Sequence, residues 1–205
     1  MVNLESDCTG KGLHMKQLLA GVCLVLLGAG TVCAGEYAEQ VAASRAIAKD
    51  FMQSLKRDLQ AGMQEGGPVN AIGVCKLTAP GIANTYSARK GWTVARTSLK
   101  LRNPDNAPDM WELGVLEDFE RRKLAGEDPA GMEHYEVVEQ DGDEVLRYMK
   151  AIPMAGMCVV CHGTDIDPIV DARLKKLYPQ DQARGFKPGD IRGAFTITQP
   201  LSEQE

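Results

Sequence analysis

The chain has 205 residues, and its 23 Lys and Arg against 28 Asp and Glu give a formal net charge of −5 at pH 7. A hydrophobic fraction of 44% and a charged fraction of 25% are typical of a globular protein, which excludes a disordered chain, a collagen-like repeat and a bundle of membrane spans. The acidic balance argues against nucleic acid or an anionic membrane as the main partner.

An apolar segment near the N-terminus predicts export. Residues 18–32 form an uninterrupted run of apolar and small side chains preceded by lysines. The run is short for a membrane span but suits the core of a secretory signal peptide. We expect cleavage after Ala34, which leaves a single domain at residues 35–205. An uncleaved anchor, which would be the one contact with a membrane, and a start at Met15 instead of Met1 remain as alternatives.

The cysteines left after export need an explanation. Removing residues 1–34 leaves Cys75, Cys158 and Cys161. Export predicts the periplasm, where free thiols oxidise unless they are occupied. An odd number of cysteines cannot pair completely within one chain, so at least one of them needs another role.

The rest of the chain predicts an α+β domain that begins with a long helix. Apolar positions at spacings of three, four and seven favour an amphipathic helix over residues 36–65, which a Gly-Gly pair ends. The proline after that pair is expected to open a second helix, which carries Cys75 and runs to about Lys76, with Pro80 restarting or bending it.

Shorter elements follow in the second half. Two prolines within residues 102–108 exclude a helix or a central strand there. The other expected elements are a strand at 92–97, a helix around 111–119, a hairpin of strands at 136–138 and 145–151, a helix at 168–178 and a strand at 192–198.

The strongest motif is C-x-x-C-H, the attachment signal of a c-type haem, formed by Cys158, Cys161 and His162. Thiols on one helical turn can each form a thioether with a haem vinyl group, and the histidine that follows can bind the iron. We therefore expect one covalently attached haem with His162 as the proximal ligand. A thiol redox pair and a zinc site that recruits Cys75 are the alternatives.

The second axial ligand stays open from spacing alone. The candidates are Cys75, His134 and the methionines, of which Met154 and Met157 lie closest to the motif. Methionines usually fill gaps in a core, and His134 lies in a charged stretch that is typical of a solvated histidine. Cys75 is the thiol that the haem leaves over, although a small buried hydrophobic residue is an equally good interpretation.

Three stretches carry a family resemblance: residues 71–75 with 79–83, residues 91–98 continuing through 102–104 and Pro108, and residues 150–153 running into 158–163. On these motifs the chain resembles a c-type haem-binding family with a PAS-like fold, long catalogued as a domain of unknown function. Its members include a soluble cyanobacterial haem protein and the extracytoplasmic sensor regions of some bacterial histidine kinases.

The resemblance implies a PAS-like antiparallel sheet flanked by helices. It also implies iron held between the motif histidine and a cysteine thiolate, and the matching positions are His162 and Cys75. The haem propionates need cationic or amide partners, for which Arg96, Arg102 and Lys150 are candidates.

Thiolate ligation has chemical consequences. A thiolate opposite an imidazole donates electron density to ferric iron and lowers the reduction potential. With both axial positions filled, we expect electron transfer or another low-potential redox role with a redox partner protein that the sequence does not identify, and no conversion of a substrate. A haem-based redox or gas sensor for NO or CO, signalling through a separate partner, is the first alternative. A peroxidase-like enzyme, which requires an open iron, is the second.

Overall fold

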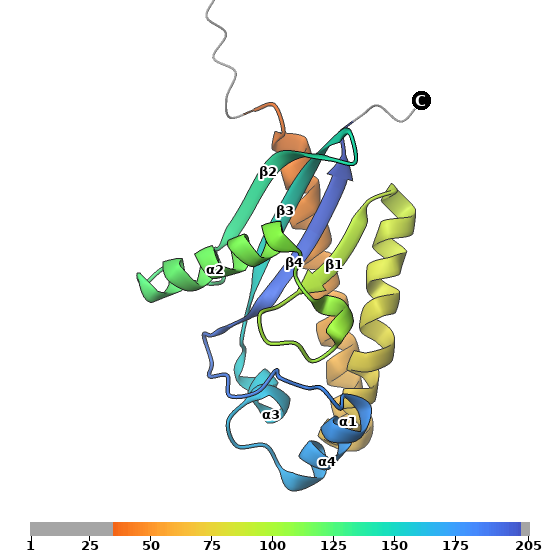
Figure 1. Cartoon of the computed structure of the whole chain (residues 1–205). Helices are drawn as coiled ribbons and strands as arrows, with labels where there is room; N and C mark the ends of the chain where they lie inside the picture. Colours follow the sequence, from red (N-terminus) through yellow and green to blue (C-terminus); the bar gives the residue numbers. More distant parts are fainter. Residues whose placement is uncertain (1–34, 202–205) are drawn as a thin grey trace, which may run out of the picture. The chain divides into compact units, whose positions relative to one another are not determined.

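A four-stranded antiparallel sheet with helices on both faces forms the centre of the fold (Figure 1). The structure is a computed structural model that describes residues 35–201, so the expected signal peptide and its cleavage site lie outside the described residues. The strands stand in the order β1-β4-β3-β2, with bounds β1 Thr93–Thr97, β2 Glu133–Gln140, β3 Asp143–Pro153 and β4 Ile191–Pro200. The expected α+β class, with helices flanking an antiparallel sheet, is confirmed.

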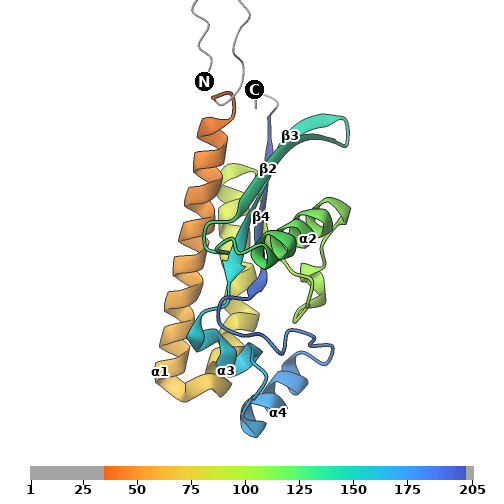
Figure 2. The ribbon, with the colours of Figure 1, turned by 90° about the vertical axis from the view of Figure 1, so that its left-hand side faces the viewer.

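The longest helix, α1 (Ala38–Lys90), bends sharply at its middle, so its two arms run side by side (Figure 2). The bend falls at Gly66 and Gly67. Gly67 has φ +66° and ψ −164°, a backbone conformation that residues with a side chain rarely adopt. The expected break at the glycine pair is confirmed. The second arm, however, continues to Lys90 rather than ending near Lys76, because packing on the sheet and on α4 compensates for the hydrogen bond that Pro80 cannot make.

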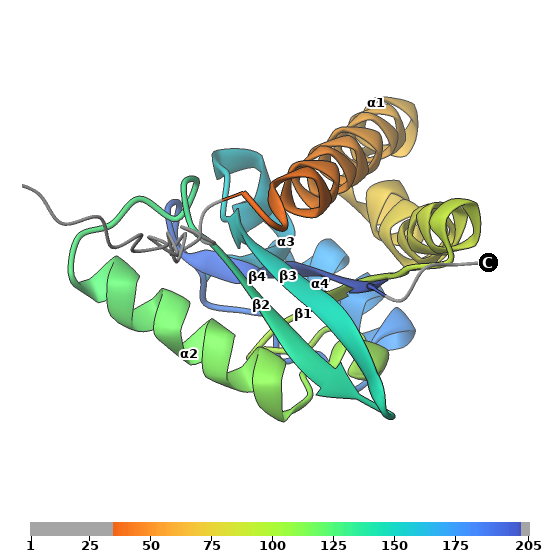
Figure 3. The ribbon, with the colours of Figure 1, turned by 90° about the horizontal axis from the view of Figure 1, so that it is seen from above.

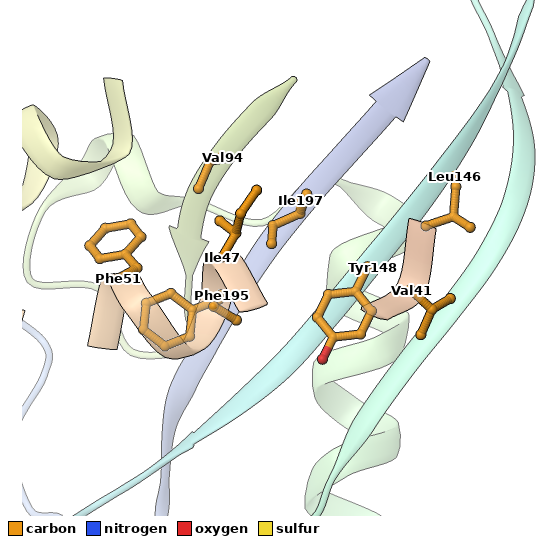
Figure 4. Packing of buried hydrophobic residues seen from close by; sticks show 9 residues of the cluster. Val41, Ile47, Phe51, Val94, Leu146, Tyr148, Phe195 and Ile197 are labelled. Atoms are coloured by element: carbon orange, nitrogen blue, oxygen red, sulfur yellow. The ribbon is translucent and has the colours of Figure 1, made fainter. Parts of the chain in front are cut away.

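The arms of α1 pack on one face of the sheet and α2 (Met110–Leu124) packs on the other (Figure 3). Side chains alternate along β3, so Leu146 and Tyr148 face α1 while Met149 and Ala151 face α2. Figure 4 shows the core on the α1 face. It contains Val41, Ile47, Ala48, Phe51, Val94, Leu146, Tyr148, Phe195 and Ile197.

The hairpin β2–β3 turns at Asp141 and Gly142, whose φ angles are +57° and +93°. Positive φ at both central residues is the pattern of a type I′ turn, which matches the twist of the flanking strands. The expected hairpin, the strand at β1, the helices at α2 and α4, and the last strand at β4 are all found, with ends that differ by a few residues. The proline-containing segment holds a single 3₁₀ turn, η1 (Pro104–Asn106).

Three short elements close one end of the sheet beside the bend of α1 (Figures 1 and 2). They are η2 (Gly156–Cys158), α3 (Val159–His162) and α4 (Pro168–Leu177). Within residues 35–201, none of the helices has both the length and the apolar character that crossing a membrane would require.

Candidate functional site

The C-x-x-C-H motif forms one short helical segment. Cys158 ends η2, and α3 carries Cys161 and His162. The turn closes through a hydrogen bond from the Gly163 amide to the Val159 carbonyl at 2.8 Å. A Cβ atom at Gly163 would lie 2.5 Å from that same carbonyl oxygen, so the tight exit from the motif requires glycine.

The imidazole of His162 is fixed by a backbone carbonyl. Its Nδ1 lies 2.9 Å from the Ala183 oxygen, and because a carbonyl only accepts, Nδ1 carries the proton and Nε2 carries the lone pair. Burial, reinforced by the charges of Arg192 and Arg102, lowers the pKa of His162 well below its ordinary value. The ring is therefore neutral, with its lone pair on Nε2, and in this structure Arg102 Nη1 lies 3.4 Å from that nitrogen and donates to it. A neutral imidazole is the form that binds a metal.

Cys75 reaches this region because the second arm of α1 packs on α4. Ile72, one turn before Cys75, is buried against α4 and Tyr178, and Cys161 packs on the same cluster. Next to Cys75, Lys76 donates a hydrogen bond from Nζ to the Leu177 carbonyl at 2.9 Å. The packing thus gathers all three cysteines of the described chain at one end of the molecule, although Cys75 is far from the motif in sequence.

The charges around Cys75 identify its neighbours. Burial raises the pKa of the thiol, while the guanidinium groups of Arg96 and Arg102 act to lower it. The Cys158 thiol raises it further. Burial likewise raises the pKa of Cys161, against the charge of Arg102 and together with the Cys75 and Cys158 thiols, so the three thiols share one local environment.

Three guanidinium groups surround this environment. Burial lowers the pKa of Arg96 and, together with repulsion from Arg102 and Arg96, lowers the pKa of Arg192 to about 10. Arg102 forms a bidentate ion pair with Asp181, with Nε–Oδ1 and Nη2–Oδ2 distances of 3.0 and 3.1 Å. Arg96 stacks on Phe51 and forms no ion pair with any described residue. Three positive charges thus face one carboxylate, which leaves a surplus that would attract an anionic group.

A cavity of about 710 Å³ lies directly beside the motif. Its lining includes Gly163 and Tyr178 and the charged side chains of Asp171, Asp181 and Arg184. Its volume falls in the range of small-molecule sites, but its lining contains none of Cys75, Cys158, Cys161 and His162.

Not every candidate from the sequence lies here. Lys150 is on β3 opposite Glu133, and its Nζ donates to the Ala130 carbonyl at 2.8 Å, so the structure does not bring it to the motif. His134 lies on the edge strand β2 with its ring 5.7 Å from that of Trp111. Met154 is close to the motif, buried with Ala183 and Phe186 and in contact with Cys158.

Two residues of this region were missed by the sequence reasoning. Arg192 belongs to a stretch for which the sequence predicts only the last strand, and its nearness to Arg96 depends on the pairing of β1 with β4. Asp181 lies in an irregular segment where no periodicity or motif marks it.

The donor set fits a covalently attached haem. Two thiols lie on one short helical segment, and the Ala183 carbonyl orients the neutral imidazole through Nδ1, which leaves the lone pair on Nε2. The surplus of guanidinium charge fits both haem propionates. Among the described residues, Cys75, Cys158, Cys161 and His162 included, no three His, Cys, Asp or Glu side chains are grouped so that they could hold a metal ion such as zinc.

Fold and site together define an α+β domain that carries a C-x-x-C-H turn beside a third cysteine and a cluster of arginines. The chain belongs to the Tll0287-like family, whose model matches residues 34–200, and this confirms the family resemblance of the sequence. Among solved structures, the cyanobacterial haem protein Tll0287 is similar, with 20% identity and a TM-score of 0.60 over 82% of this chain and 99% of that one. This likeness shows the shared fold. No curated protein sequence gives a significant match.

Proposed function

We propose that this protein is a haem protein with one c-type haem, held by thioethers to Cys158 and Cys161. His162 and Cys75 are the axial ligands in this proposal. The observation that carries it is the C-x-x-C-H turn with a neutral, oriented imidazole, which the fold places beside a third cysteine and surplus guanidinium charge. The family membership of the chain and the haem named for the similar cyanobacterial protein support the same cofactor.

Each residue of the site has a distinct part in the proposal. The thiols of the motif would tether the group, and the Ala183 carbonyl, which accepts from Nδ1 of His162, would leave Nε2 as the nitrogen that binds the iron. Arg96 and Arg192 hold the propionates, because their partly buried charges lack sufficient carboxylate partners. The bound haem supplies one-electron chemistry, and the residues around it set its potential.

The proposed role is electron transfer, or another low-potential redox function, in the periplasm with a separate redox protein. Two protein ligands close both axial positions, which suits electron transfer and leaves no position for a substrate. The proposal therefore does not make the protein a substrate-converting enzyme.

The test is expression with a cytochrome c maturation system, followed by haem staining of the denatured protein. We expect the wild type to retain haem and the Cys158→Ser/Cys161→Ser variant to lose it. Cys75→Ala is the matched variant, because it removes a thiol of the same region while the motif stays intact. It should retain covalent haem but change the ferric absorption spectrum.

Each result decides one part of the proposal. A wild type without covalent haem contradicts the cofactor. An unchanged ferric spectrum in Cys75→Ala contradicts thiolate ligation, and a charge-transfer band of iron–methionine bonding assigns the position to a methionine instead.

One observation favours a second candidate, a haem-based redox or gas sensor. Cys75 comes from α1, whereas Cys158, Cys161 and His162 belong to the motif segment, so the bond from Cys75 to the iron could break while the haem stays attached, and NO or CO could then bind there. Rapid CO binding by the reduced wild type, measured by stopped-flow absorbance, would favour the sensor. A reduced protein that does not react with CO would favour the electron carrier.

A further inference from the structure

The buried carboxylate of Asp181 accepts hydrogen bonds from two arginines and from a backbone amide beside the motif. Its side chain is only 2% exposed, although it is charged. Oδ1 accepts from the Ala183 amide at 3.0 Å and from Arg102 Nε at 3.0 Å. Oδ2 accepts from Arg102 Nη2 at 3.1 Å and from Arg184 Nε at 3.0 Å.

These bonds fix the peptide that orients His162. Asp181 holds the Ala183 amide directly, and through Arg102 Nη2 it also holds the Ala183 carbonyl, at 3.1 Å. That carbonyl is the oxygen to which His162 Nδ1 donates. Arg102 Nη2 also donates to the Cys161 carbonyl at 2.5 Å, so the same pair anchors the motif helix itself.

The segment around Ala183 does not depend on Asp181 alone. The Gly185 amide donates to the Gly163 carbonyl at 3.0 Å, and the Phe186 amide donates to the His162 carbonyl at 3.0 Å. Removal of the carboxylate should therefore loosen the orientation of the Ala183 peptide while the segment stays attached to the motif.

The charge of Asp181 acts in the same region. It opposes the positive charges of Arg102 and Arg192, and no other carboxylate forms an ion pair with Arg102 among the described residues. A negative charge near a redox centre stabilises its oxidised form, because oxidation adds positive charge.

We infer that Asp181 is a positioning residue for His162, which holds the Ala183 carbonyl against Nδ1 and lowers the reduction potential through this bond and its own charge. The inference rests on the proposed function, since it concerns the proximal ligand of that haem. Both effects have the same sign: a firm Nδ1–H···O bond makes the imidazole a stronger electron donor, and the carboxylate charge favours ferric iron.

The test compares the reduction potentials of the haem-loaded wild type and Asp181→Asn by spectroelectrochemistry. We expect the variant to retain covalent haem and to have a higher potential. At a fixed ambient potential, its oxidised-to-reduced ratio should fall about tenfold, which corresponds to about 59 mV for a one-electron couple.

Asp171→Asn is the matched control. Asp171 also pairs with Arg184, so both variants remove a carboxylate partner of that arginine, but Asp171 contacts neither Arg102 nor residue 183 among the described contacts. Both variants should lower the melting temperature, and only Asp181→Asn should raise the potential. Equal potentials in Asp181→Asn and the wild type overturn the inference and leave the proposed function intact, whereas a wild type without haem overturns the proposed function first.

Asp181→Glu covers the case in which Asp181→Asn fails to load haem. It keeps the charge, but the longer side chain cannot hold the Ala183 amide and both Arg102 nitrogens in the same geometry. We expect a smaller rise in potential. A potential equal to that of the wild type in the loaded Asp181→Glu protein overturns the inference.

Discussion

Glu133 illustrates how one charged side chain ties distant parts of this chain together. Its carboxylate accepts hydrogen bonds from Arg45 on α1, with both Nε–O distances at 2.9 Å, and from the buried hydroxyl of Tyr148 on β3 at 2.9 Å. The Arg45 bridge, together with the Tyr148 hydroxyl and against the effect of burial, lowers the pKa of Glu133 below its ordinary value of 4.5. The ionised form is thus the one that the fold prefers.

This preference predicts a pH dependence of stability. The pKa is lower in the folded state, so the stabilisation is complete above the unfolded value of about 4.5 and is lost as the pH falls through the lower folded value. Glu133→Gln should lower the free energy of unfolding at pH 7 by about 1–2 kcal/mol and flatten its decline below pH 4.5. Urea unfolding from pH 3 to pH 7 measures both effects.

Glu139→Gln is the control, because Glu139 is exposed on the same strand. Its stability should stay within about 0.5 kcal/mol of the wild type. An acid limb as steep in Glu133→Gln as in the wild type would contradict the assignment of this stabilisation to Glu133.

Individual residues also show how much of the site could be predicted from the sequence. The motif was evident because Cys158 and His162 are neighbours along the chain and their spacing carries the chemistry. Lys150 was proposed as a propionate partner from charge alone. It lies two residues after Tyr148 on the same strand, and so on the same face of the sheet beside Glu133, which only the strand register reveals.

At the scale of elements, the bend of α1 decides where the site forms. Phe51 on the first arm and Tyr86 on the second stack with their ring centroids 6.4 Å apart, and both pack on the sheet. Gly67, with its φ of +66°, is the residue that allows the chain to reverse. The glycine pair was recognisable in the sequence, but the length of the second arm depends on tertiary contacts that no local pattern contains.

Gly67→Ala should therefore destabilise the protein. Its φ and ψ fall in a region that is nearly restricted to glycine, so an alanine there costs about 1–3 kcal/mol of the free energy of unfolding. Thermal unfolding of the variant measures this cost.

Gly81→Ala on the second arm is the matched control. It lies within the helix in an exposed position, and no atom lies within 4 Å of an added Cβ. There alanine should stabilise by about 0.5–1 kcal/mol, because glycine weakens a helix interior. Equal effects of the two substitutions would argue against strain at the bend.

At the scale of the whole molecule, the core is unevenly distributed. Large clusters fill both faces of the sheet, whereas the end with α3 and α4 has two small ones. The smallest consists of Met154, Ala183 and Phe186, with Cys158 and Val159 packed against it. Aromatic residues make up only 5% of the chain, and a bound haem would add flat apolar surface where the protein supplies least.

Under the proposed function, loss of the haem should therefore destabilise this end of the fold more than the sheet. In a haem-free Cys158→Ser/Cys161→Ser protein, we expect amide hydrogen exchange to accelerate across residues 156–190, while β3 and β4 keep their protection. The haem-loaded wild type is the reference. Unchanged protection at residues 156–190 would contradict a structural part for the haem in this end of the fold.

The distance along the chain between Cys75 and the C-x-x-C-H turn sets an order of events during maturation. The attachment motif is contiguous, so a maturation enzyme can recognise it before the chain has any tertiary structure. Cys75 becomes a neighbour only after the bend has formed and the second arm has docked on α4. Under the proposed function, covalent attachment can precede folding, whereas ligation by Cys75 requires that folding is complete. The absorption spectrum of the haem with both ligands bound would therefore report when the chain has folded.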